Sequence, residues 1–199
     1  MVEEFSFYLI KTDYLYLVGD LGGNYPDYKS RPMLIIPDGD TEGIYWAIPL
    51  SSYENKTDLQ KRKIEGYMSK DKSNSQSSFY HLIQTNRISV LNISNALPVT
   101  EGDLFREYTF GGKRLVISDV AEKYEIWKKL STVIQRSRTH PEKSVTKAAV
   151  VYEYLKEEIA GRTEEKQPAV EELVDQAKLR AAEKNEDRER RTRTRKSAR

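Results

Sequence analysis

The sequence contains no cysteine, and this absence excludes disulfide scaffolds, cysteine-ligated zinc sites and thiol nucleophiles. It also contains no run near the roughly 18 apolar residues that a membrane-spanning helix requires. The first residues include Glu3 and Glu4 in place of the basic and then apolar run of a secretory signal. We therefore expect a cytoplasmic protein with no membrane association.

Apolar residues are scarce in this chain. They make up 38% of its 199 residues, against about 45–50% in an ordinary globular protein, whereas charged residues reach 32%. The net charge of +2 hides an uneven distribution, because the last twelve residues hold seven basic residues and one acidic residue. We expect one folded domain at 1–161, a candidate extra helix at 162–181 and a basic, disordered tail at 182–199.

The first two thirds of the sequence favour short strands joined by turns. Aromatic and β-branched runs bounded by Gly, Pro, Asn and Asp are typical of strands. Such runs lie at 5–10, 33–36, 44–50, 79–84, 88–93 and 114–117. The turn Pro37-Asp38-Gly39-Asp40 predicts a hairpin over 33–50, and the glycines and prolines of 19–32 predict a loop.

Two further segments between these runs are predicted to be partly helical. The polar stretch 54–77 predicts a frayed helix followed by a mobile loop. Thr100 and Asp103 match the chemistry of a capping box, which predicts a short helix through Tyr108. Gly111-Gly112 then predicts a turn into the last strand.

Helical periodicity begins after residue 118. Apolar residues recur there at intervals of three and four, which predicts an amphipathic helix that His140-Pro141 breaks. Its apolar stripe is Val120, Tyr124, Trp127, Leu130, Val133 and Ile134. A second such helix spans Val145 to Ile159 and is expected to end at Gly161. Strands early in the chain and helices late indicate an α+β domain.

The sequence lacks the motifs of several enzyme classes. It has no P-loop, no nucleophile elbow, no H-E-x-x-H pair and no dinucleotide-binding glycine motif. His81 lies in an aromatic strand, which is typical of a packed or rim residue, and His140 precedes a proline at a helix boundary, which favours a structural role. No cluster of metal ligands is visible, and we expect neither a metal nor another cofactor.

One segment combines groups that can hold a phosphate. A buried strand is predicted to end near Pro49, and Ser51, Ser52 and, four residues on, Lys56 follow it. Hydroxyl groups donate hydrogen bonds to phosphate oxygens, and an ammonium group supplies charge. The same residues also fit a plain strand end followed by a helix cap.

Three segments, spread over roughly 5–160, match a known pattern. They are Phe7-Tyr8-Leu9-Ile10 followed by Tyr14, Arg31-Pro32-Met33-Leu34-Ile35-Ile36, and Tyr45-Trp46-Ala47-Ile48-Pro49-Leu50-Ser51-Ser52. In this order they resemble the type III toxin–antitoxin endoribonucleases of the ToxN/AbiQ superfamily, in particular its CptN and TenpN branches. The Pro-Leu-Ser-Ser piece is the most specific part of the resemblance.

The resemblance implies a fold and an activity. The fold would be a MazF/Kid-like, partly open antiparallel β-barrel with two long C-terminal helices packed on it. The activity would be metal-independent cleavage of single-stranded RNA, by attack of a 2′-hydroxyl that leaves a 2′,3′-cyclic phosphate and a 5′-hydroxyl. The implied partners are a repeated RNA antitoxin, with which such phage-defence toxins form hetero-oligomers, and a cellular or phage RNA substrate.

The resemblance also implies catalytic residues. Ser51 and Ser52 take the positions of the paired hydroxyls, and Tyr14 matches an active-site tyrosine that donates a proton or stacks on a base. The family's lysine has no counterpart at the matching position. The nearest lysine is Lys56, and Lys11 is the alternative base.

Other residues are candidates for RNA binding. Arg31 suits charge stabilisation, Lys11 is a further RNA-binding candidate, and Tyr28 is placed either to stack on a base or to cover the barrel. The tail arginines would bind phosphates by counterion release. They are Arg188, Arg190, Arg191, Arg193 and Arg195. Two other functions stay open: a non-catalytic RNA-binding or scaffold protein, and a DNA-associated accessory protein.

Overall fold

The computed structural model describes residues 2–24 and 31–161. By its internal contacts the chain divides into a unit Met1–Lys156 and a second unit that begins at Glu157. The expected domain end at 161 falls within the second unit. The predicted helix at 162–181 and tail at 182–199 lie outside the described residues.

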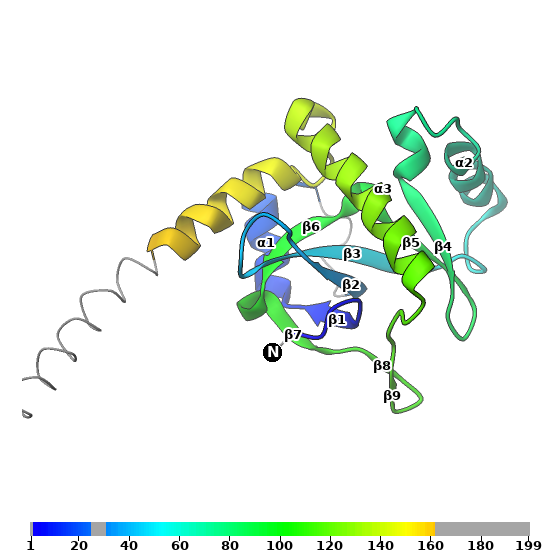
Figure 1. The fold of residues 1–199 in the computed structure, drawn as a ribbon, viewed down its shortest axis with the longest axis horizontal. Helices are drawn as coiled ribbons and strands as arrows, with labels where there is room; N and C mark the ends of the chain where they lie inside the picture. Colours follow the sequence, from blue (N-terminus) through cyan, green and yellow to red (C-terminus); the bar gives the residue numbers. More distant parts are fainter. Residues whose placement is uncertain (1, 25–30, 162–199) are drawn as a thin grey trace, which may run out of the picture. The chain divides into compact units, whose positions relative to one another are not determined.

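Seven strands of the first unit form one antiparallel sheet, in the order β4-β5-β3-β2-β1-β7 with β6 added to β3 (Figure 1). A small second sheet pairs β8 with β9. The strands are β1 (Phe7–Ile10), β2 (Pro32–Pro37), β3 (Ile44–Ser52), β4 (Tyr80–Gln84), β5 (Ile88–Asn92), β6 (Leu97–Thr100), β7 (Leu104–Glu107), β8 (Thr109–Phe110) and β9 (Lys113–Arg114). The predicted hairpin over 33–50 and the predicted strand pair at 79–84 and 88–93 are confirmed.

The sheet curls into a partly open barrel. β6 and β7 lie at opposite edges of the order β7-β1-β2-β3-β6, although only Glu101–Asp103 separates them in the chain. So short a connection requires the two edges to approach each other, which closes a sheet on itself. No ladder joins β6 to β7 among the described strands, so the seam stays open there. The expected α+β class and antiparallel barrel are confirmed.

Four helices, together with short 3-10 turns, accompany the sheet within the described residues. They are α1 (Thr12–Asp20), α2 (Asp58–Met68), α3 (Val120–Thr139) and a helix at 148–161, with 3-10 turns at Ser75–Ser78, Ile93–Asn95, Glu101–Asp103 and Pro141–Lys143. The β2 residues Met33 to Ile36 are all buried, so both faces of this strand are covered. A strand that is buried on both faces needs other elements packed against each face. None of the helices described is long and apolar enough to cross a membrane.

The two predicted C-terminal helices are present. α3 ends at His140-Pro141 as expected, and Asp119 caps it by accepting a hydrogen bond from the N–H of Glu122 at 2.7 Å. In the helix at 148–161, the Tyr152 ring stacks on Trp46 with centroids 5.8 Å apart. Asp38 joins the two rings, because its carboxylate accepts from Trp46 Nε1 at 2.8 Å and from the Tyr152 hydroxyl at 2.7 Å. Gly161 is the last described residue of this helix.

The predicted stripe of α3 is partly wrong. Leu130 and Val133 are buried as expected, but the buried face continues through Ile126 and Ser137. Val120, Tyr124 and Trp127 are 78%, 59% and 50% exposed. The helix buries a face rotated from the predicted one, because Ile126, Leu130, Val133 and Ser137 themselves recur at helical spacing.

The prediction of a short helix over 100–108 is wrong. The Thr100–Asp103 contacts are present, since the Asp103 carboxylate accepts from the Thr100 N–H at 2.7 Å. They close only one 3-10 turn, after which Leu104–Glu107 continues as β7 and pairs with β1. Pairing with a distant strand overrides a local helix signal.

Two other local predictions need correction. α1 was not expected, and it occupies the first residues of the predicted loop 19–32. Its N-cap residue Lys11 makes no side-chain capping bond, so the usual start signal is missing. The predicted frayed helix is the well-capped α2, in which Thr57 and Gln60 form a reciprocal capping box. The predicted strand at 114–117 is wrong in its bounds: Lys113–Arg114 pairs across a Gly111-Gly112 turn at φ 57° and 74°, and beyond it Val116 forms an isolated bridge with Ser6.

The end of α1 gives a stability prediction. A Cβ at Gly23 would lie 2.6 Å from the Thr146 carbonyl oxygen and 2.9 Å from that of Val18, and neither backbone atom can move cheaply. Gly23→Ala should therefore lower the free energy of unfolding by about 1–3 kcal/mol, measured by urea denaturation. Gly39→Ala is the matched control, because a Cβ there meets no atom within 4 Å. Equal stabilities of the two variants would contradict the packing described at Gly23.

Candidate active site

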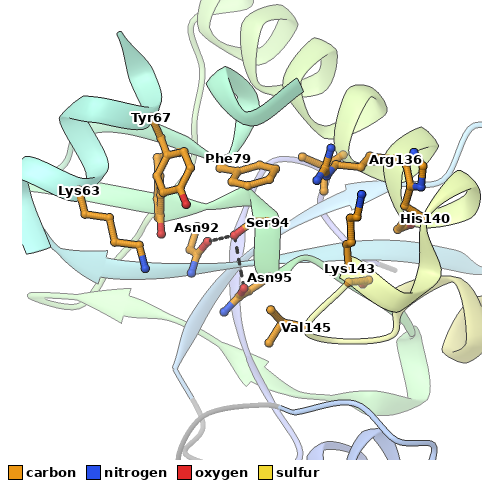
Figure 2. A pocket seen from close by; sticks show the side chains of 14 residues that line it. Lys63, Tyr67, Phe79, Asn92, Ser94, Asn95, Arg136, His140, Lys143 and Val145 are labelled. Carbon is orange, nitrogen blue, oxygen red and sulfur yellow. Dashed lines mark hydrogen bonds between the residues drawn. The ribbon is translucent and has the colours of Figure 1, made fainter. Parts of the chain in front are cut away.

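Three adjoining cavities form a groove at the end of β3. Their volumes are about 310, 190 and 60 Å³. Asn92, at the end of β5, lines all three. Lys63 and Tyr80 are shared by the two larger cavities, and Ser51 and Lys56 by the two smaller ones. We call this continuous surface the β3 groove; Figure 2 shows its largest cavity.

The β3 groove is lined by cations and neutral polar groups. Its charged or chargeable lining residues are Arg31, Lys56, Lys63, Arg136, His140 and Lys143. No Asp or Glu is among the described residues that line it. Because the whole chain has a net charge of only +2, the groove is a local concentration of positive charge. A cleft lined by one sign of charge attracts and orients the opposite sign, here an anion.

The structure brings together three of the predicted site residues. Arg31, Ser51 and Lys56 line the smallest cavity together with Pro49 and Asn92. Burial lowers the pKa of Lys56 from its usual value, and the positive charge of Arg31 lowers it further. A half-buried lysine with a lowered pKa is a better proton acceptor near neutral pH than an exposed one.

The two predicted hydroxyls lie on opposite sides of β3. Ser51 pairs with Val90 and Ser52 with Ser89 in an unbroken register with β5. Successive side chains of a strand point to opposite faces, so only one of the two can face the groove. Ser51 lines it, whereas the Ser52 hydroxyl accepts a 3.4 Å hydrogen bond from the N–H of Asn55 in the following turn.

Other predicted residues lie elsewhere. Tyr14 is buried on α1, and its hydroxyl donates to the carbonyl of Pro98. Lys11 donates from Nζ to the Gly102 carbonyl at 2.6 Å, at the β6–β7 corner. Neither residue lines the groove. Tyr28 lies outside the described residues, and so do Arg188, Arg190, Arg191, Arg193 and Arg195. The roles of these residues stay predictions.

Most residues of the groove wall were not predicted from the sequence. Lys63 comes from α2, Asn92 from β5, and Arg136 and Lys143 from the end of α3 and the turn after it. His140 was assigned a structural role, but it also lines the groove. A usable signal is the aromatic group at positions 67, 79 and 80, which the sequence divides between a predicted helix at 54–77 and a predicted strand at 79–84. The rest required the tertiary fold, because these positions are far apart in the sequence.

The remaining histidine is a packing residue, as its position in an aromatic strand suggested. His81 Nε2 lies 3.1 Å from Glu122 Oε1, and Nδ1 lies 3.3 Å from Lys129 Nζ. Burial lowers the pKa of His81 and Lys129 lowers it further, while Glu122 opposes both. Within residues 2–24 and 31–161, no group of three or more His, Asp or Glu side chains could hold a metal ion.

Comparisons with known proteins give only distant likenesses. No protein-family model matches the chain, and no curated protein matches it. Among solved structures, the chain is similar to an endoribonuclease in complex with its cognate antitoxin from Mycobacterial species, with 11% identity over 68% of this chain and 96% of that one and a TM-score of 0.38. It is also similar to the Mycobacterium tuberculosis toxin MazF-mt6, with 11% identity, 65% and 96% coverage and a TM-score of 0.35. At such identities neither structure assigns an activity to this chain.

The environment of Lys56 gives a prediction that needs no substrate. The pKa of Lys56 should lie below that of an ordinary lysine, and Arg31→Gln should raise it because one of its two causes is removed. It should stay below the ordinary value, because burial is the larger cause. An NMR titration of the Lys56 side chain in isotope-labelled protein measures this. Arg138→Gln, outside the groove lining, should leave the pKa unchanged; an unchanged pKa in Arg31→Gln would place the guanidinium away from Lys56.

Proposed function

We propose that this protein is an endoribonuclease that cuts single-stranded RNA without a metal ion. The β3 groove carries the proposal, because it joins Ser51, Lys56 and Arg31 to a run of cations free of carboxylates among its described lining residues. The described lining residues that a polyanion meets in this groove are positive or neutral, and Glu142 lies outside the lining, 3.7 Å from His140 Nδ1. An unpaired strand fits better than a duplex, since the wall includes aromatic rings on which bases can stack.

The three clustered residues suit attack by a ribose 2′-hydroxyl on the adjacent phosphate. Neutral Lys56 accepts the proton of the 2′-hydroxyl as the O2′–P bond forms. The Ser51 hydroxyl and the Arg31 guanidinium stabilise the negative charge that develops on the phosphoryl oxygens. The P–O5′ bond then breaks, and O5′ takes a proton from solvent. The products are a 2′,3′-cyclic phosphate and a 5′-hydroxyl.

We further propose that the enzyme is a toxin of a type III toxin–antitoxin system. The support is the resemblance of 5–160 to that family, and its most specific piece, Pro49-Leu50-Ser51-Ser52, contains Ser51, the hydroxyl that lines the groove. A repeated, folded RNA would then serve as the antitoxin and form a hetero-oligomer with the protein. A cytoplasmic location and a role in phage defence belong to the same proposal.

A non-catalytic RNA-binding or scaffold protein is the second candidate. The alternation of β3 favours it, because only one of the two motif hydroxyls reaches the groove and Tyr14 is buried. The two candidates share the cationic groove, so both expect salt-sensitive RNA binding. They differ in cleavage alone.

Cleavage assays on purified protein separate the two candidates. Wild type should cut single-stranded RNA in the presence of EDTA and leave 2′,3′-cyclic phosphate ends. Ser51→Ala and Lys56→Gln should each lower kcat by roughly 10²–10³-fold, since each removes a group that acts in the transition state. Lys128→Gln, an exposed lysine on α3 outside the groove lining, should cut like wild type.

Three results would count against the proposal. Fragments with 3′-hydroxyl ends would exclude attack by the 2′-hydroxyl, and loss of cleavage in EDTA would exclude a metal-independent reaction. RNA binding that falls with salt, without cleavage by wild type, would establish the binding protein instead. Ser52→Ala adds a further comparison. The Ser52 side chain faces away from that of Ser51, so we expect its removal to lower kcat less than tenfold.

A further inference from the structure

We propose that the largest cavity of the β3 groove is a recognition subsite that holds one unstacked nucleotide of the RNA, next to the phosphate at Ser51. The inference deepens the proposed function and rests on it for the identity of the polymer. The cavity has a volume of about 310 Å³, and α2, β4, the end of β5 and the end of α3 all contribute to its lining.

Aromatic rings form one side of the subsite. The ring centroids of Tyr67 and Phe79 lie 5.4 Å apart at 46°, and those of Tyr67 and Tyr80 lie 5.9 Å apart at 43°. All three side chains are only partly buried and line the cavity, and Figure 2 shows Tyr67 and Phe79 there. An exposed aromatic face beside a positively charged groove is a stacking platform for a base.

Two amide side chains form the floor, and a hydrogen bond fixes the orientation of one of them. The Ser94 hydroxyl donates to Asn92 Oδ1 at 2.7 Å and lies 3.4 Å from Asn95 Oδ1 (Figure 2). The Asn92 carbonyl oxygen is therefore turned toward Ser94, which leaves the NH₂ group of Asn92 as a donor. The single hydroxyl proton of Ser94 is used in this bond, so the longer contact does not orient Asn95. A donor at a fixed position can distinguish the acceptor atoms on one base edge from those on another.

Cations line the subsite beside the rings. Arg136 lies with its Cζ 5.7 Å from the centre of the Phe79 ring and donates from Nη1 to Ser75 Oγ at 2.9 Å, so its position is held from two directions. Lys143 and His140 follow from the end of α3 and are exposed. A base on Phe79 would thus have a guanidinium and an ammonium nearby for its phosphate.

Continuity with the proposed reaction centre fixes the place of this nucleotide. Asn92 lines the subsite and the cavity of Ser51 and Lys56, and Lys63 and Tyr80 line both larger cavities. A strand of RNA can therefore run from one cavity to the next without crossing a described carboxylate. Free phosphate would use the cations alone, whereas a nucleotide uses the rings and the amides as well.

Mononucleotide binding tests the subsite apart from cleavage, because a mononucleotide has no phosphodiester to cut. Adenosine and guanosine 5′-monophosphates are titrated into full-length protein by calorimetry, beside the nucleosides and inorganic phosphate. At least one nucleotide should bind more tightly than its nucleoside and than phosphate. Phe79→Leu, which keeps the apolar bulk and removes the ring, should weaken it about 5- to 150-fold.

Further variants guard against misfolding and separate the two proposals. Lys143→Gln changes an exposed side chain and should also weaken nucleotide binding, whereas Lys128→Gln should not. Ser51→Ala should bind mononucleotides like wild type even where it no longer cuts RNA. In the cleaving enzyme, Phe79→Leu should alter the preferred base at one position beside the cut.

The outcomes are distinct. Phosphate binding as tightly as every nucleotide, or Phe79→Leu binding and cleaving with unchanged preference, would overturn the subsite and leave the ribonuclease proposal standing. Nucleotide binding that depends on Phe79 and Lys143, in a protein that cuts no RNA, would support the subsite and overturn the ribonuclease.

Discussion

Along one edge, β3 changes its partner strand from β6 to β5, and this change positions the groove. On that edge, β6 pairs with Ile44–Ala47 and β5 pairs with Leu50–Ser52, so the ladder is interrupted at Ile48-Pro49. A proline has no N–H that would need an acceptor, and it suits a position where one ladder ends and another begins. The chain that returns from β5 to β6 must bridge this interruption, and it does so with the turn that carries Asn92, Ser94 and Asn95. The interruption of the ladder therefore positions both the amide side chains of the floor and Ser51 at the end of the groove.

The positive charges of the groove repel one another. Arg31 and burial both disfavour the charged form of Lys56. Two carboxylates are engaged away from the groove, since Glu65 accepts from the Tyr53 hydroxyl and Glu122 pairs with His81, whereas Glu142 lies 3.7 Å from the groove residue His140. Like charges that gather in one cleft repel each other, and an anionic ligand relieves this repulsion, so such a groove suits the binding of an anion better than it suits stability.

Local patterns in the sequence predicted the local structure. The hairpin at 33–50 and the helix ending at His140 follow from turn residues and periodicity within single segments. α1 and β7 were missed for opposite reasons. α1 has a buried face but no capping side chain, and β7 follows a genuine capping box but gains more from pairing with β1. The exposed Val120, Tyr124 and Trp127 show that apolar spacing predicts a helix more safely than it predicts which face is buried.

Some residues of the candidate site could be predicted from local sequence, and others could not. Ser51 and Lys56 are five residues apart and could be found together, because the strand end and the following turn keep them close. Ser52 looked equivalent in the sequence, and only the register with β5 separates it from Ser51. Arg136 and Lys143 reach the groove from residues far along the chain, and a net charge of +2 gave no sign of them. Affinity for a polyanion depends on where charges gather, and here folding, not composition, gathers them.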